Sequence, residues 1–193
     1  MAFEDGSILV LAGGRSRRMG RDKRLIAMSS GSFLLERTIE KLKTLNAPIF
    51  LAVAADDASR PHLEGVAFLW DRRPHEGPLT ALIDASEAIE GSILAVAADL
   101  PGLQARFLEE LVKENALHPE AWAVVPRREE RAHPLCAVYR PKAIERLREA
   151  AEGSQRSFRE ALESFPSGRV YWWEVKEQES LHNWNRRDDR EHR

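Results

Sequence analysis

A cluster of basic residues lies close to the start of the chain, directly after an apolar segment that ends in two glycines. Five cations follow Gly13 and Gly14 within nine positions: Arg15, Arg17, Arg18, Arg21 and Lys23. Glycine accepts positive φ angles and lets backbone N–H groups approach a ligand closely, so the pair can form an anion-binding concavity. Arginine and lysine would neutralise charge that the backbone alone cannot. This pattern predicts a polyphosphate site, and a solvated basic loop is the alternative.

The spacing within this segment differs from that of the two common phosphate-binding loops. A P-loop places Lys and Ser or Thr directly after its second glycine, whereas Gly20 is followed by Arg21 and Asp22. The dinucleotide fingerprint G-x-G-x-x-G does not occur in the sequence either. The segment therefore indicates triphosphate binding by another kind of loop.

Asp99 is the second feature that points to chemistry. It follows the apolar segment 93–98 and precedes a Leu-Pro pair, so its carboxylate is expected at the end of a buried strand. Magnesium prefers oxygen ligands and commonly uses one or two carboxylates together with substrate phosphates and water. One aspartate is therefore enough for a magnesium site, although an aspartate that caps the following turn has the same sequence context.

Alternating strand and helix patterns place these residues in a fold. Apolar or β-branched segments predict strands at 7–14, 49–54, 66–70, 93–98, 121–126, 134–140 and 169–175. Helical periodicity predicts helices at 32–45, 78–89, 104–117, 141–151 and 157–165. Such alternation is typical of βαβ units on a parallel sheet, where ligands bind beyond the carboxyl ends of the strands. The basic segment and Asp99 should both lie at that edge.

The predicted fold class is α/β, with one Rossmann-like domain of three layers, α/β/α, around a mostly parallel central sheet. The segments 121–126 and 134–140 are joined by charged residues and predict a hairpin or a small extra β-ribbon. No repeat, low-complexity tract or linker divides the sequence, so residues 1–193 are expected to form a single domain with a frayed tail at 186–193.

Composition limits the classes of function. A formal net charge of -2 and a pI near 6.3 argue against a nucleic-acid or membrane-surface binder, since both need a large positive field. The N-terminal residues are acidic, and no apolar segment is long enough to cross a bilayer. Cys136 is the single cysteine and cannot form an internal disulfide. We expect a cytoplasmic protein in which Cys136 is a buried, inert thiol.

The sequence resembles a known family at the basic segment. Residues 11–23 read LAGGRSRRMGRDK and match every fixed position of L-A-G-G-x-S-x-R-M-G-x-D-K, the signature of the molybdenum cofactor guanylyltransferases. This family belongs to the nucleotide-diphospho-sugar transferase superfamily, in which two related groups, the sugar-phosphate nucleotidyltransferases and the methylerythritol cytidylyltransferases, carry Pro-Lys instead of Asp-Lys. The resemblance continues through Asp71, EGPLTAL (76–82), AADLPGL (97–103) and HPLCAVY (133–139), so it covers nearly the whole chain.

The resemblance implies roles for individual residues. Residues that contact the nucleotide would be Leu11, Ala12, Gly13, Gly14, Lys23, Asp71 and Asp99. Catalysis would depend on Arg18 and Lys23, which hold the phosphates, and on Asp99, which binds Mg²⁺. The second substrate would contact Gly77, Pro78, His133, Asn183 and Asn185.

Two positions depart from the family pattern. Relatives carry an asparagine near the end of the second strand that contacts the nucleotide, whereas this chain has Ala52, Val53 and Ala54. Near the C-terminus, Arg186 and Arg187 replace the Thr-Pro that follows the paired asparagines. The identity of the base is therefore less firmly implied than triphosphate binding.

The resemblance implies transfer of GMP from GTP to the terminal phosphate of molybdopterin or molybdenum-molybdopterin, with release of pyrophosphate. This nucleophile is already anionic near neutral pH, since the second phosphate pKa is about 6, so no general base is needed. A cytidylyltransferase that acts on the same pterin is one alternative. A GTP-binding partner of molybdoenzyme assembly proteins, without catalysis, is another.

Overall fold

The computed structural model describes residues 2–12, 34–54, 63–73, 76–153 and 157–176. Within them the strands are β1 (Gly6–Leu11), β2 (Ile49–Ala54), β3 (Val66–Asp71), β4 (Ser92–Ala97), β5 (Ala123–Arg128), β6 (Arg131–Ala132), β7 (Cys136–Tyr139) and β8 (Val170–Glu174). The helices are α1 (Leu34–Lys43), α2 (Pro78–Ser86), α3 (Ala105–Leu117), α4 (Pro141–Glu152) and α5 (Phe158–Glu163). Each predicted strand and helix is confirmed, with ends that shift by up to three residues.

All of these strands belong to one sheet with the order β3-β2-β1-β4-β7-β5-β6, and β8 pairs with β5. The strands β1 to β4 pair in parallel, as do β5 and β8, so the prediction of a mostly parallel sheet is confirmed. In the chain, α1 connects β1 to β2, and α2 lies between β3 and β4. Helical crossovers suit this arrangement, because a parallel pair of strands cannot be joined by a tight turn.

The predicted ribbon is only partly separate from the sheet. β7 lies inside the sheet and pairs antiparallel with both β4 and β5, while only the short β5–β6 pair projects as a ribbon. All four residues of β7 are buried. A strand that is apolar on both faces is stable only when helices cover both faces, which explains its central position.

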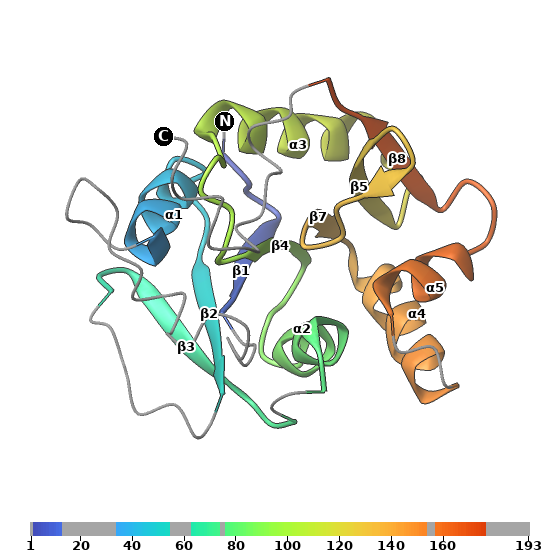
Figure 1. Ribbon diagram of the computed structural model, residues 1–193, viewed down its shortest axis with the longest axis horizontal. Coiled ribbons are helices and arrows are strands. Elements are labelled where there is room, and N and C mark those ends of the chain that lie inside the picture. Colours follow the sequence, from blue (N-terminus) through green and yellow to red (C-terminus); the bar gives the residue numbers. More distant parts are fainter. Residues whose placement is uncertain (1, 13–33, 55–62, 74–75, 154–156, 177–193) are drawn as a thin grey trace, which may run out of the picture.

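Helices cover both faces of the sheet, so the three-layer prediction is confirmed (Figure 1). On one face, α1 and α3 pack on the sheet through Leu35, Ile39, Leu42, Phe107 and Leu111. On the other, α2, α4 and α5 contribute Leu82, Ile144, Leu147, Phe158 and Leu162. Burial of each such side chain contributes about 1.5–3 kcal/mol, so the strand ends between these layers are held rigidly. None of the helices in the described ranges is long and apolar enough to cross a membrane.

Candidate active site

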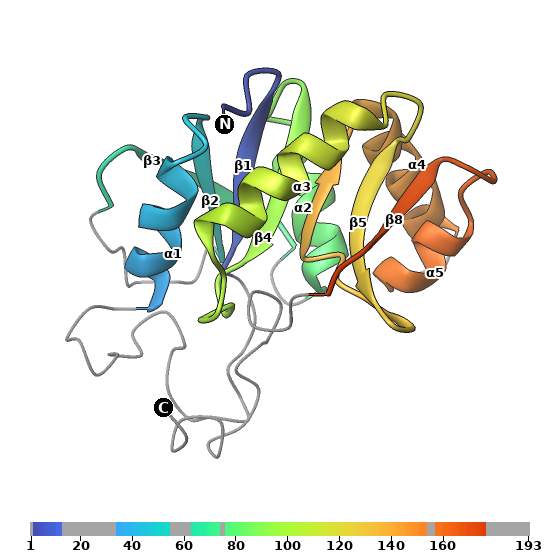
Figure 2. The same cartoon turned by 90° about the horizontal axis from the view of Figure 1, so that it is seen from above.

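The carboxyl ends of β1 and β4 lie side by side at one edge of the sheet (Figure 2). Leu11 is the register partner of Ala97, and the backbone N–H of Ala98 donates to the Leu11 carbonyl at 3.2 Å. On the other side of β1, the N–H of Ala12 donates to the Ala52 carbonyl at 3.4 Å. Ala12 is the last described residue before the basic segment 13–23. The described chain before that segment therefore ends beside Ala98, the residue that precedes Asp99.

Asp99 lies two residues beyond β4, in the turn that leads to α3, and its side chain is partly buried. The neighbouring Leu100 is buried in the core, and the Nζ of Lys41 donates to the Pro101 carbonyl at 3.4 Å. The turn is thus tied to the core on one side and to α1 on the other. Its carboxylate is placed at the sheet edge by the structure around it.

The ligand chemistry at this edge fits magnesium. In the part of the chain that the structure describes, no three His, Cys, Asp or Glu side chains gather to hold a metal ion. Magnesium needs only one or two carboxylates and completes its shell with phosphate oxygens and water. Asp99 therefore fits a magnesium site that a bound triphosphate completes.

His133 lies on the other side of β4. Because β7 runs antiparallel to β4, its start is at the same edge, and the N–H of Ala97 donates to the Leu135 carbonyl at 2.7 Å. The N–H of His133 donates to the Pro126 carbonyl at 2.9 Å. Burial, with a smaller contribution from the charge of Arg131, lowers the pKa of His133 to about 4. The imidazole is therefore neutral near pH 7.

The stability of the protein should depend on pH through His133. In the unfolded chain this imidazole takes up a proton near its usual pKa of about 6.5, whereas in the folded chain its pKa is about 4. Between these values the unfolded state binds more protons, so the free energy of unfolding falls as the pH falls. The free energy of unfolding, measured with urea, should fall less between about pH 7 and about pH 5 for His133→Gln than for the wild type. Equal losses would contradict a half-buried imidazole that is neutral in the folded protein.

Asp71 is the last residue of β3, and its side chain is buried. Its Oδ1 accepts a hydrogen bond from the N–H of Arg73 at 3.0 Å, so this carboxylate caps the turn that follows β3. Between Asp71 and β1 lies β2, where Ala52 and Val53 are buried and Ala54 is the register partner of Asp71. Three strand spacings separate β3 from β4, which is about 14 Å. A nucleotide contact at Asp71 remains a prediction.

Gly77 and Pro78 form the start of α2. Gly77 has φ 106° and ψ 170°, a conformation that is almost restricted to glycine, and a Cβ added there would meet no atom within 4 Å. The requirement for glycine is therefore one of backbone conformation. Arg73, which follows β3, forms an ion pair with Asp84 of α2 at 2.6 Å and so links the end of β3 to this helix. The structure thus explains the local sequence, and a substrate role at these two residues remains a prediction.

Six residues of the predicted site lie outside the described residues: Gly13, Gly14, Arg18, Lys23, Asn183 and Asn185. Leu11, Ala12, Asp99 and His133 lie at one edge of the sheet, which is formed by the carboxyl ends of β1 and β4 and the start of β7. Two residues near this site were missed by the sequence reasoning. One is Arg131, whose charge acts on His133, and the other is Tyr139, whose hydroxyl donates to the Pro134 carbonyl at 2.7 Å. A tyrosine in an otherwise apolar strand was the available signal for the second.

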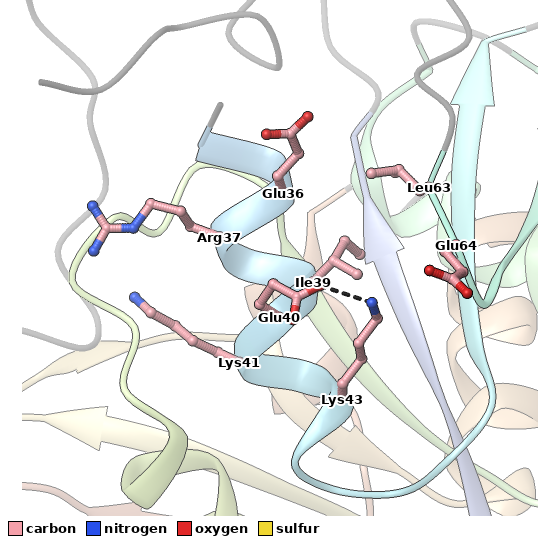
Figure 3. A pocket seen from close by; sticks show the side chains of 8 residues that line it. All are labelled: Glu36, Arg37, Ile39, Glu40, Lys41, Lys43, Leu63 and Glu64. Carbon is pink, nitrogen blue, oxygen red and sulfur yellow. Dashed lines mark hydrogen bonds and ion pairs between the residues drawn. The ribbon is translucent and has the colours of Figure 1, made fainter. Parts of the chain in front are cut away.

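A hollow with a volume of about 540 Å³ lies along α1 (Figure 3). Its lining combines three acidic and three basic side chains, Glu36, Glu40 and Glu64 with Arg37, Lys41 and Lys43. Arg37 and Lys41 extend from the same side of α1, and burial and the neighbouring Arg37 lower the pKa of Lys41. A lining with balanced charge does not favour a triphosphate. The edge beside Asp99 is therefore the better candidate site.

Known proteins resemble this chain over most of its length. Residues 8–166 match the family described as the MobA-like NTP transferase domain. A probable molybdenum cofactor guanylyltransferase from Mycobacterium marinum is 33% identical over 167 residues, which cover 84% of this chain and 81% of that protein. The one from Mycobacterium tuberculosis is 38% identical over 144 residues, or 72% of this chain and 70% of that protein. The crystal structure of molybdopterin-guanine dinucleotide biosynthesis protein A from Archaeoglobus fulgidus superposes with a TM-score of 0.75 and 26% identity, covering 95% of this chain and 94% of that one.

Proposed function

We propose, because the chain belongs to the MobA-like NTP transferase family, that it transfers the GMP unit of GTP to the terminal phosphate of molybdopterin and releases pyrophosphate. One observation carries this proposal beyond the likeness to relatives. The Ala98 N–H donates a hydrogen bond to the Leu11 carbonyl, so Ala12, the last described residue before the basic segment, and Asp99 both follow paired strand ends. This pairing supports a site in which cations for a triphosphate and a carboxylate for its metal share one edge of the sheet.

The order of the strands suggests how the two substrates are arranged. From β3 through β2 and β1 to β4, the edge presents Asp71, the apolar end of β2, Ala12 and then Asp99. His133 follows at the start of β7. We assign the nucleotide to the β1–β3 side and the pterin phosphate to the β7 side. The distance of about 14 Å between β3 and β4 accommodates a nucleotide whose base lies near β3.

The reaction needs no proton transfer by the protein. An oxygen of the acceptor phosphate is anionic near neutral pH and forms the new bond to the α-phosphorus of GTP. The bond from this phosphorus to the β-phosphate bridging oxygen breaks, and pyrophosphate leaves with that electron pair. His133 is neutral in this pH range and can donate or accept a hydrogen bond without adding charge. The protein's task is to hold two polyanions together and to stabilise the charge that develops on them.

Asp99 would hold the magnesium ion, which supplies charge neutralisation between the phosphates when it is bound. Its turn is tied to the core through Leu100 and to α1 through Lys41, which supports a fixed backbone position for this residue. Arg18 and Lys23 are the basic residues that we assign to the phosphates and to the leaving pyrophosphate. These two assignments rest on the sequence motif of the segment 13–23.

Guanine is the base that we propose, because the relatives that match most of the chain are named guanylyltransferases. No side-chain amide is present at 52–54, and Ala52 and Val53 are buried in the sheet. Contacts to the base must therefore come from the backbone or from other residues. A cytidylyltransferase and a GTP-binding protein without catalysis are the other outcomes of the experiment below.

Pyrophosphate release should be observed with GTP, magnesium and molybdopterin together, and with no other nucleoside triphosphate. The assay compares the four triphosphates under identical conditions, with EDTA in a parallel series to remove the metal. Release with CTP alone would identify the cytidylyl alternative. Tight binding of GTP without any release would identify a non-catalytic partner. Activity that EDTA does not lower would contradict the proposed metal.

Further parts of the proposal concern the setting of the enzyme. We propose that residues 1–193 work as one domain, because all described strands belong to a single sheet. The cytoplasm is the proposed compartment, since the triphosphate donor is available there. Molybdoenzyme assembly proteins are a further proposed class of partner that would receive the product.

A further inference from the structure

The turn 133–135, between the β5–β6 ribbon and β7, is held by backbone and side-chain hydrogen bonds. The N–H of His133 donates to the Pro126 carbonyl at 2.9 Å, and the N–H of Cys136 donates to the His133 carbonyl at 3.0 Å. The Leu135 carbonyl accepts from the N–H of Ala97 at 2.7 Å. Pro134 has no N–H, and its carbonyl accepts from the hydroxyl of Tyr139 at 2.7 Å. One side chain thus completes an otherwise backbone-bonded turn.

Tyr139 makes this hydrogen bond from a fully buried position. Its side chain has 0% exposure, and its backbone is the register partner of Ile93 at the start of β4, near the opposite edge of the sheet. The ring therefore extends through the core toward the turn and packs near Phe158, with ring centroids 5.9 Å apart. A buried hydroxyl is costly unless it is bonded, so a purely apolar role would favour phenylalanine at this position.

The turn connects to both sides of the site. His133 lies at its start, and the bond from Ala97 to Leu135 attaches it to β4 two residues before Asp99. A shift of the turn would therefore move the imidazole relative to the carboxylate that holds the metal. Burial raises the pKa of the Tyr139 hydroxyl well above its usual value, so this group remains a hydrogen-bond donor throughout the working pH range.

We propose that Tyr139 is a positioning residue for the acceptor substrate: its buried hydroxyl holds the turn 133–135 so that His133 faces the phosphate of the pterin beside Asp99. This inference rests on the proposed function for the identity of the acceptor. The mechanical part, that the hydroxyl sets the position and environment of His133, stands on the hydrogen bonds alone.

Tyr139→Phe tests the proposal because it removes one oxygen and keeps the ring. The other tyrosine, Tyr171, provides a matched control, because Tyr171→Phe also removes only a hydroxyl. Tyr171 lies on β8, and its ring stacks on His118 with the ring centroids 3.5 Å apart. Ile93→Val is a second control that loosens the core next to Tyr139 without touching the turn. We expect Tyr139→Phe to raise the KM for molybdopterin about tenfold, the effect of one buried acceptor left without its donor, with the KM for GTP unchanged. Both controls should leave the KM for molybdopterin at the wild-type value.

A second measurement does not depend on the activity. The NMR signal of the His133 ring, assigned with His133→Gln, is followed from about pH 8 to about pH 5.5, where the wild-type imidazole stays neutral because its pKa is about 4. In Tyr139→Phe the turn admits water, and the signal should begin to titrate within this range; in both controls it should not. A Tyr139→Phe protein that matches the controls in this signal overturns the proposal. Absence of transfer in the wild type refutes the proposed function and the acceptor assignment, while this signal still decides the role of Tyr139.

Discussion

Replacement of Asp99 by alanine should lower kcat for pyrophosphate release by about 10²–10³-fold, the usual effect of losing one preorganised electrostatic contact to the transition state. Asp99 lies just beyond β4, whose end pairs with the end of β1, and its carboxylate would hold the metal that neutralises phosphate charge. Asp99→Asn keeps the size of the side chain and removes the charge, so it should lose nearly as much. Steady-state rates of pyrophosphate release at saturating GTP and magnesium provide the measurement.

A control aspartate separates this effect from general loss of charge. Asp5 is exposed and precedes β1, at the opposite edge of the sheet from Asp99. Asp5→Ala should keep wild-type turnover. A magnesium titration adds a second criterion, since the Asp99 variants should need a higher magnesium concentration for whatever activity remains. Wild-type turnover and wild-type magnesium dependence in Asp99→Ala would refute the metal assignment.

Lys23→Ala should be comparably damaging, with a loss of about 2–4 kcal/mol of transition-state stabilisation measured from kcat/KM. Lysine at this position matches the last residue of the family signature, and its ammonium group would balance charge on the phosphates and on the leaving pyrophosphate. The ground state also carries phosphate charge, so we expect the KM for GTP to rise while kcat falls. Lys23→Arg keeps the charge and should recover part of the activity.

The control for Lys23 is a lysine that already has a carboxylate partner. The Nζ of Lys43 donates to Glu40 at 2.7 Å on the outer side of α1, and surface pairs of this kind contribute little. Lys43→Ala should therefore leave kcat/KM for GTP unchanged. If Lys23→Ala retains wild-type kcat/KM, the basic segment does not contact the phosphates, and the solvated-loop alternative is correct.

The fold alone does not determine which base or acceptor the enzyme uses. A parallel sheet between helices brings the ends of β1 and β4 together in many nucleotide-binding proteins, and function depends on the side chains placed there. In this chain the specific features are the signature at 11–23, Asp99 and the turn 133–135. The substitutions proposed above test each of these features separately.

Local sequence patterns were sufficient to predict the secondary structure and the fold class. Residues 93–96 are aliphatic and buried on both faces of β4, and the helical spacing of Ile39 and Leu42 faces the core. Such periodicity reports which face of an element is buried, so it depends on neighbours a few residues away. The same holds for the signature at 11–23, where adjacent residue types indicate phosphate binding without any knowledge of distant contacts.

The sequence by itself thus determined the class of fold and the family, and it predicted phosphate binding at residues 11–23 and metal binding at Asp99. Only the tertiary structure decided that β7 enters the sheet between β4 and β5, which brings His133 to the side of β4 opposite β1. It also showed that Tyr139 reaches Pro134 through the core. The position of β7 depends on pairing between segments some forty residues apart, and the Tyr139 contact depends on the direction of one buried ring. No local sequence pattern encodes either of these. The physical reason is that strand order is set by the competition of whole apolar surfaces for burial, which is a property of the assembled chain.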